Sequence, residues 1–450
     1  MSLFPSFPVS ELVVTSLALA GIALPALGVA LVALPYAIAA VTAMFRRDPG
    51  GAFVPRRAVV QSRGGGIACL VLATLALVAV QPRFFRPHGA AVAAQAAGGD
   101  DVLRSGIVPD VKALIDSLPC AGVVVGVVQP TCNQVFGFGR SSVGRDGTPD
   151  GETVFEIGEL TQVFTGLLLA RMAEEKAVRL DQPVLSLLPD TVSVPTFQSQ
   201  PIELQHLATW SSGLPRLAQH PASPWMDALP PFSRAAPFRS KKWLYDLLSS
   251  LDISHAPGTH LDGSDLGMGL LGLALERASK SDYESALERE ICDPLGLRST
   301  RVKLTPAMRE HVAEGMRMGW GSYQGWYVAS PERRWPDRTI PGANGLCSSA
   351  NDLLTLLRAH LAGFPMASTL ELSRRPRFQV MDGPEVGLGW FIEGTPGGNL
   401  VWQQGAAGVH RSYMAFVDGR GVGVVVLSNA PIDVSLLGKR ILNRLLAAGV

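Results

Sequence analysis

The pattern of hydrophobic and polar positions divides the chain into an apolar front and a mixed remainder. No charged residue occurs over residues 12–45, a run of 34 positions, and a second uncharged run covers residues 64–81. About 20 apolar residues suffice to cross a bilayer. The two runs therefore predict two transmembrane helices, and a membrane helix tolerates the prolines Pro25 and Pro35 inside the first run.

The segment between the two runs is strongly basic. Residues 46–63 contain five arginines and one acidic residue, Asp48. Because basic loops stay in the cytoplasm, residues 1–83 are predicted to form a hairpin in the cytoplasmic membrane, which places the C-terminal domain on the outer side. The alternative is that the second run is a signal peptide cleaved near residues 90–97. Residues 84–105 are rich in Ala, Gly and Pro, which predicts a linker.

Residues 106–450 carry strand and helix patterns in an order typical of an α+β domain. Strand patterns predict a hairpin near the start and four strands near the end, at 122–128, 134–139, 386–392, 399–403, 412–417 and 421–427. Helical patterns occur at about 111–118, 160–177 and 434–446. The middle one is apolar on nearly every side, as expected of a buried helix. The sequence thus predicts an antiparallel sheet built from both ends of the domain and flanked by helices, with a helical insert between them.

Composition excludes several classes of protein. The 39 basic and 38 acidic side chains leave a net charge of +1, which provides no basic field for binding nucleic acid. The five cysteines show no paired Cys-x-x-Cys spacing, so we expect no zinc site and no cofactor. On the oxidising outer side, Cys120 and Cys132 are left with two alternatives, one disulfide or two free thiols.

Several short motifs of the domain occur in the order of a known family. They include Phe155-Glu-Ile-Gly158, Leu180-Asp-Gln-Pro-Val184, Ser212-Gly-Leu-Pro215, Pro257-Gly-Thr259, Gly387-Leu-Gly-Trp390 and Leu427-Ser-Asn429. Over residues 107–445 the chain resembles the serine β-lactamase and DD-peptidase superfamily. The resemblance is to its class C β-lactamase-related branch, which also holds esterases and penicillin-binding-protein-like peptidases. It implies a β-lactamase/transpeptidase-like fold.

The first catalytic motif of that family is substituted here. The family places Ser-x-x-Lys at the start of the buried helix, where the lysine takes the proton of the serine hydroxyl. The matching positions of this chain hold Glu159 and Gln162. A glutamine amide does not accept a proton at useful pH, and attack by a glutamate would give an unstable anhydride. The usual nucleophile and its base are therefore both missing.

The second and third motifs are substituted as well. The family's Tyr-x-Asn corresponds to Gly263, Ser264 and Asp265, so the tyrosine oxygen that helps to move protons is replaced by a residue without a side chain. The family's Lys- or His-x-Gly corresponds to Gln403-Gln404-Gly405. The glycine remains, and with it the backbone that helps to shape the oxyanion hole. The cation or imidazole of the family is lost, because its position holds Gln403.

The substitutions in all three motifs predict a pseudoenzyme. Together with the predicted membrane hairpin, they indicate a membrane-anchored protein with a ligand-binding or regulatory role in the cell envelope. We expect a small molecule or peptide in the cleft, bound by residues at the motif positions and one nearby histidine: Glu159, Gln162, Ser264, Asp265, Gln403, Gly405 and His410. With Asp262 added to Glu159 and Asp265 the cleft is acidic, which disfavours anionic penicillins and favours a cationic ligand. Three such oxygen ligands also make a metal site a remote alternative.

The competing hypothesis is an active hydrolase or acyltransferase of esterase, peptidase or β-lactamase type with a non-standard nucleophile. Its candidates are Ser264, Ser212 and Thr161, with His410 as an acid or base. Each has a structural interpretation as well, because hydroxyls in turns and at helix starts usually satisfy backbone amides. A third hypothesis treats the membrane hairpin as the working part and the outer domain as its interaction platform.

Overall fold

The computed structural model describes residues 101–116, 121–142, 147–215, 240–316 and 340–447, together with short strands at 45–47, 53–55, 84–85, 95–96 and 327–328. The predicted transmembrane spans lie outside these residues, apart from Phe45. No helix within the described part of the chain is long and apolar enough to cross a membrane. Cys120 also lies outside it, and Cys132 is an exposed free thiol.

The chain divides into two compact units. Residues 1–88 and 318–330 form one unit, and residues 89–317 and 331–450 form the other. The strands described in the first unit are β1 (Phe45–Arg47) with β2 (Phe53–Pro55), and β3 (Phe84–Phe85) with β8 (Tyr327–Val328), both antiparallel pairs. The region predicted as a linker, 84–105, contains β3, β4 (Gln95–Ala96) and the start of helix α5 (Asp101–Asp116).

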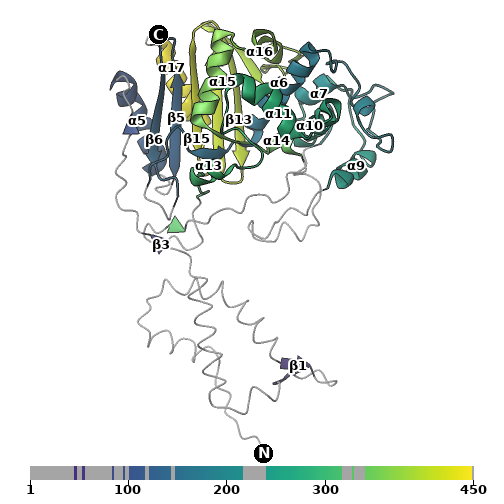
Figure 1. Ribbon diagram of the computed structural model, residues 1–450, viewed down its shortest axis with the longest axis horizontal. Helices are drawn as coiled ribbons and strands as arrows, with labels where there is room; N and C mark the ends of the chain where they lie inside the picture. Colours follow the sequence, from purple (N-terminus) through teal and green to yellow (C-terminus); the bar gives the residue numbers. More distant parts are fainter. Residues whose placement is uncertain are drawn as a thin grey trace, which may run out of the picture. The chain divides into compact units, whose positions relative to one another are not determined.

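The second unit is built on a nine-stranded antiparallel sheet of order β10-β11-β12-β13-β14-β15-β5-β6-β4. Besides β4, its strands are β5 (Gly122–Val128), β6 (Asn133–Gly139), β10 (Phe378–Gln379), β11 (Glu385–Val386), β12 (Phe391–Thr395), β13 (Gly398–Ala407), β14 (His410–Val417) and β15 (Val422–Ser428). The last strand of the chain pairs with the first long one, with Val425 opposite Gly126. Figure 1 shows this contact between the yellow and blue strands, which confirms the predicted sheet from both chain ends.

One predicted strand, 386–392, is wrong in its middle. The chain forms a tight turn there, in which the Gly387 N–H donates to the Trp390 carbonyl, and β11 and β12 lie on either side of it. Gly389 has a φ of +80°, a conformation that side-chain-bearing residues rarely adopt. Its N–H donates to the carbonyl of Ala208, so the turn also ties the sheet to the helical part.

Helices cover both faces of the sheet. Side chains alternate between the two faces along each strand, so the apolar residues of each face need a covering layer. On one face, α17 (Ser435–Ala447) lies over β14 and β15 and also contacts α5. On the other, α15 (Ala350–Ala362) lies over β5 and β15, and the helical part of the unit extends beyond it (Figure 1). A small separate pair, β7 (Val154–Glu156) with β9 (Cys347–Ser349), leads the chain from the sheet toward the buried helix.

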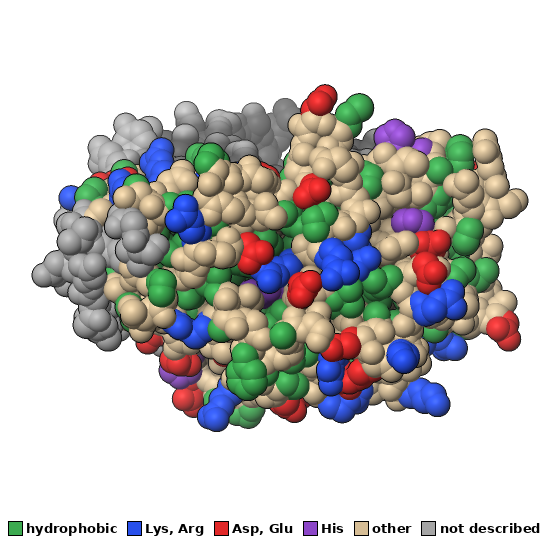
Figure 2. Space-filling view, turned by 90° about the horizontal axis from the view of Figure 1, so that it is seen from above, with side chains coloured by type: hydrophobic (Ala, Val, Ile, Leu, Met, Phe, Trp, Pro, Cys, Tyr) green, Lys and Arg blue, Asp and Glu red, His purple; other side chains and the backbone are tan. Residues whose placement is uncertain are grey.

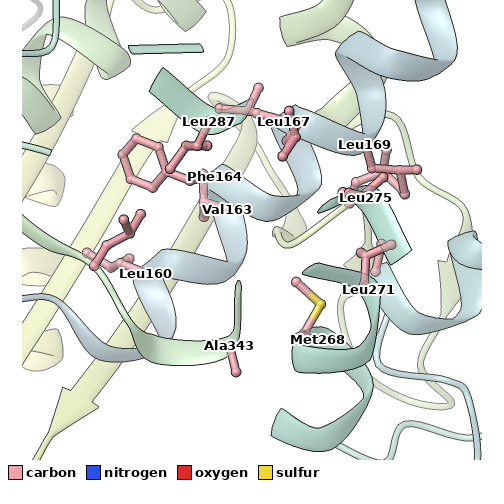
Figure 3. Packing of buried hydrophobic residues seen from close by; sticks show 14 of the residues in the cluster. Leu160, Val163, Phe164, Leu167, Leu169, Met268, Leu271, Leu275, Leu287 and Ala343 are labelled. Atoms are coloured by element: carbon pink, nitrogen blue, oxygen red, sulfur yellow. The ribbon is translucent and has the colours of Figure 1, made fainter. Parts of the chain in front are cut away.

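The buried helix is α6 (Thr161–Glu174), which confirms the predicted helix although it ends at Glu174. Its apolar residues contact α10 (Asp265–Ser279), α11 (Tyr283–Leu287) and α14 (Pro341–Asn344), as Figure 3 shows. This core fixes the start of α6, where the first family motif lies. The remaining helical segments are η1 (Gly158–Leu160), η2 (Val184–Leu187), α7 (Leu204–Ala208), α9 (Lys241–Ser249), the π-helical turn Glu288–Cys292, α12 (Asp293–Leu295), α13 (Pro306–Glu310) and α16 (Ala367–Arg374).

The surface charge of the domain is mixed. On the face shown in Figure 2, Lys and Arg side chains are interspersed with Asp and Glu side chains. This distribution agrees with the net charge of +1.

Candidate functional site

The motif positions converge where η1 meets strand β13. A Cβ built on Gly158 would lie 2.5 to 2.7 Å from backbone atoms of Ala406, and one built on Gly405 would lie 2.2 Å from the Ile157 carbonyl oxygen. Only glycine permits this approach of two backbones. The Ser412 hydroxyl reinforces the contact by donating to the Ile157 carbonyl at 2.8 Å. The glycine retained from the third motif therefore still places the strand beside the helix start.

Glu159 fills the position of the family's serine with a carboxylate that bonds to the strand. Its Oε2 accepts a hydrogen bond from the Ala406 backbone N–H, with 2.5 Å between nitrogen and oxygen. Ala406 directly follows the motif glycine. A charge-assisted bond of this kind is among the stronger hydrogen bonds of proteins. The side chain that replaces the nucleophile thus caps the backbone that would shape an oxyanion hole.

The free edge of β13 explains why caps are needed there. Strand β12 pairs with β13 only as far as Trp402. Among the strands that the structure describes, the last residues of β13 therefore pair with β14 alone. Alternate N–H groups of an antiparallel strand point to the same side. On the side away from β14, Gln404 N bonds to Gln403 Oε1 at 2.8 Å and Ala406 N bonds to Glu159. Gln403 also donates to the Gly389 carbonyl at 3.3 Å.

Gln162, at the lysine position, is fixed at both ends of its amide. Its Oε1 accepts from Trp210 Nε1 at 2.6 Å, and its Nε2 donates to Asp265 Oδ1 at 3.1 Å. Only 3% of Gln162 and 4% of Trp210 is exposed. The structure therefore brings together the predicted residues Gln162 and Asp265. Gln162 has an amide where the family has the lysine cation, and Asp265 has a carboxylate where the family has the asparagine amide.

The second motif starts helix α10. Gly263 has a φ of +60°, which suits a glycine in the turn before the helix. The Ser264 hydroxyl donates to the Pro215 carbonyl at 2.8 Å and accepts from the Gly267 N–H at 3.0 Å, so it caps α10. Ser264 is 1% exposed. This hydroxyl is held as a structural cap and is not presented to solvent.

The other residues considered for displaced chemistry are also buried. Thr161 accepts from the Leu346 N–H at 3.1 Å and Ser212 from the Leu214 N–H at 3.3 Å, and neither side chain is exposed. His410 is 4% exposed and lies edge-on to Phe155, with 6.1 Å between ring centroids. In the described structure these three side chains face protein atoms.

Asp262 belongs to a different arrangement from the predicted acidic cleft. Its Oδ2 accepts from the Gly213 N–H at 2.7 Å, and its Oδ1 lies 2.9 Å from His255 Nε2. The carboxylate therefore joins the Ser-Gly-Leu-Pro turn to a histidine. Over the residues that the structure describes, no three His, Cys, Asp or Glu side chains are placed to hold a metal ion.

Three participants were missed from the sequence. Trp210 has a φ of +53° and stacks on Phe391, with 4.7 Å between ring centroids. Its tie to Gln162 spans 48 positions. Ala406 acts through its backbone, which no side-chain motif reveals, and His255 shows no spacing signal toward Asp262. For Trp210 the sequence offers one signal, which is its position directly before the Ser-Ser-Gly-Leu-Pro turn.

Comparison with known proteins decides the family. A family model described as Beta-lactamase matches residues 110–448. The chain belongs to the β-lactamase family. The D-alanyl-D-alanine-carboxypeptidase/endopeptidase AmpH of Escherichia coli (strain K12) is 27% identical over 337 residues, covering 69% of this chain and 80% of that protein. The human protein named Putative beta-lactamase-like 1 is 24% identical over 321 residues, covering 66% of this chain and 58% of that protein.

Solved structures of this β-lactamase family confirm the predicted fold. The beta-lactamase/D-alanine carboxypeptidase from Yersinia pestis, complexed with citrate, aligns with a TM-score of 0.63 at 22% identity, over 78% of this chain and 99% of that one. Its counterpart from Pseudomonas syringae aligns with a TM-score of 0.65 at 20% identity, over 76% and 99%. The β-lactamase/transpeptidase-like α+β architecture is therefore shared.

Proposed function

We propose that this β-lactamase-family protein is a catalytically silent member of the family that binds a ligand or regulates a process in the cell envelope. One observation carries the proposal. The residue at the nucleophile position, Glu159, has its carboxylate bonded to the Ala406 N–H. Side chains that replace a catalytic pair and are then held in structural hydrogen bonds no longer carry out its chemistry.

The chemistry at the lysine position supports the same conclusion. Gln162 uses its carbonyl oxygen for Trp210 and its amide nitrogen for Asp265, so its amide groups are engaged and neither end accepts a proton. Proton transfer by a positioned base contributes about 10²- to 10⁴-fold to catalysis. Where nucleophile and base are both removed, backbone and binding contributions leave about 10³- to 10⁴-fold over water.

The location and ligand are part of the same proposal. The uncharged runs 12–45 and 64–81 with their basic loop support a hairpin in the cytoplasmic membrane and a domain on the outer side. The cleft takes a small molecule or peptide. Because Glu159 and Asp265 place carboxylates at two motif positions, anionic penicillins bind more weakly than they do to relatives with a lysine at the first motif.

A second candidate function is hydrolysis with non-standard machinery. Several relatives carry the names of enzymes, such as the D-alanyl-D-alanine-carboxypeptidase/endopeptidase AmpH and the Beta-lactamase of Escherichia coli (strain K12). The observation that favours it is the pair of His255 and Asp262, 2.9 Å apart, with 21% of the histidine side chain exposed. A carboxylate that orients an imidazole is a recurring element of hydrolytic sites.

Covalent labelling distinguishes the two functions. The full chain is incubated separately with a fluorescent penicillin and a fluorophosphonate, and its intact mass is measured while circular dichroism confirms the fold. The silent cleft predicts no adduct with either probe. An adduct that maps to one residue of the cleft contradicts the proposal and identifies the nucleophile of an active hydrolase.

A further inference from the structure

The two caps on the free edge of β13 come from substituted motif positions. Glu159 stands where the family has its nucleophile, and Gln403 stands where it has a cation or an imidazole. Each places a side-chain oxygen on an N–H of the unpaired strand edge, at Ala406 and at Gln404. The cap at Ala406 is a carboxylate, so the group that occupies this part of the edge is an anion.

We infer that Glu159 is a tethered occupant of a carboxylate-binding site, which closes the cleft to free carboxylates and to acyl oxygens. The site is the Ala406 N–H, which is held beside η1 because Gly158 and Gly405 have no side chains to keep η1 and β13 apart. The inference rests on the proposed function, because only a chain with no nucleophile at position 159 has this occupant. Removal of the Glu159 carboxylate leaves the N–H without its acceptor and opens the site to a carboxylate from solution.

The location allows a small molecule to replace the side chain. Glu159 is half-buried and Ala406 is exposed, so the hydrogen bond lies at the surface of the domain. A free carboxylate that binds there restores the charge that the substitution of Glu159 removes. It therefore brings no more negative charge near Asp265 than the native chain already has.

Three substitutions separate the tethered occupant from other effects. Glu159→Ala removes the acceptor and the charge. Glu159→Gln keeps an acceptor oxygen but removes the charge, so it still caps Ala406, less strongly. Glu175→Ala is the matched control, because it removes an exposed carboxylate at the C-terminal end of α6, the helix that follows η1, where Glu175 pairs with Arg171.

The test measures the affinity of the full-length protein for benzoate by calorimetry and by ligand-observed NMR. Because the native chain must first give up a charge-assisted hydrogen bond, we expect Glu159→Ala to bind benzoate at least about tenfold more tightly than the native chain. Glu159→Gln should lie between the two, and Glu175→Ala should match the native chain. Equal affinities in all four proteins, with the fold intact by circular dichroism, would overturn the inference.

Hydrogen exchange gives a second measurement that does not depend on ligand affinity. The peptide that contains residues 403–407 should exchange its amide hydrogens faster in Glu159→Ala than in the native chain, and benzoate should restore protection. Unchanged exchange also overturns the inference. Neither result bears on the silent cleft, because that proposal fails only if the native chain itself is acylated.

Discussion

At the scale of single residues, Gln162 ties the buried helix to two other parts of the site. It joins the start of α6 to Trp210 and to the first residue of α10. The substitution itself could be read from the sequence, because the motif spacing identified positions 159 and 162. Of its two partners, Asp265 could be placed in the same cleft through the second motif, whereas Trp210 lies 48 positions away, belongs to no catalytic motif and meets Gln162 only through the tertiary fold.

Replacing Gln162 by leucine tests the strength of this tie. Gln162→Leu preserves volume but leaves the buried indole N–H of Trp210 without its acceptor, which costs about 1–3 kcal/mol. We expect the free energy of unfolding by urea to fall by this amount. Gln404→Leu is the control, because this side chain is exposed, and we expect a change within about 0.5 kcal/mol. Equal effects of the two substitutions would show that the amide is not a structural tie.

At the scale of elements, the site depends on the close approach of η1 and β13. Strand β13 was predictable from its alternating pattern, but only as far as residue 403. The alternation of apolar and polar residues ends there, because Gln404, Gly405 and Ala406 follow. The strand continues to Ala407 because β14 supplies a full partner there. Neither this extension nor the turn that splits 386–392 can be predicted from the local sequence, because both depend on contacts with distant segments.

The approach of the two elements predicts a large effect of a single methyl group. In Gly405→Ala the new Cβ would lie 2.2 Å from the Ile157 carbonyl oxygen and 2.8 Å from Glu159 N. We expect a loss of about 2 kcal/mol or more in the free energy of unfolding. The matched control is Gly394→Ala in β12, where no atom lies within 4 Å of the new Cβ. If both variants are as stable as the native chain, the elements are not in close contact.

At the scale of the whole molecule, His360 predicts how stability depends on pH. It is buried between Trp390 and Phe416, and neither ring nitrogen has a hydrogen-bond partner among the described residues. Burial, with a smaller contribution from Arg374, lowers the pKa of His360 to about 3. The unfolded chain takes up this proton near pH 6.5 and the folded chain does not. Stability is therefore lost as the pH falls from about 6.5 toward 3.

Removing the buried imidazole should flatten this dependence. In His360→Leu we expect the free energy of unfolding to fall less steeply between pH 6.5 and pH 4 than in the native chain, as measured by urea titrations at each pH. His260→Gln is the control, because His260 is exposed, and its slope should match that of the native chain. Parallel slopes in all three proteins would contradict the role of His360.

The proposed placement of the domain on the outer side of the membrane can be tested through a thiol. Cys132 is exposed, whereas Cys292 and Cys347 are buried, and burial raises the pKa of Cys292 to about 12. A maleimide that does not cross membranes should label Cys132 in intact spheroplasts that express the full chain. Peptide mapping should find the label on Cys132, and Cys132→Ser should lose it from that peptide. Labelling of Cys132 only after lysis would place the domain on the inner side.

The central claim is that the substitutions at positions 159 and 162 silence the cleft, and one mass measurement tests it most directly. The native chain, Glu159→Ser and the double variant Glu159→Ser/Gln162→Lys are incubated with a penicillin, and their intact masses are followed over time. We predict no adduct on the native chain or on Glu159→Ser, which still lacks a base, and an acyl adduct on the double variant. An adduct on the native chain would contradict the account.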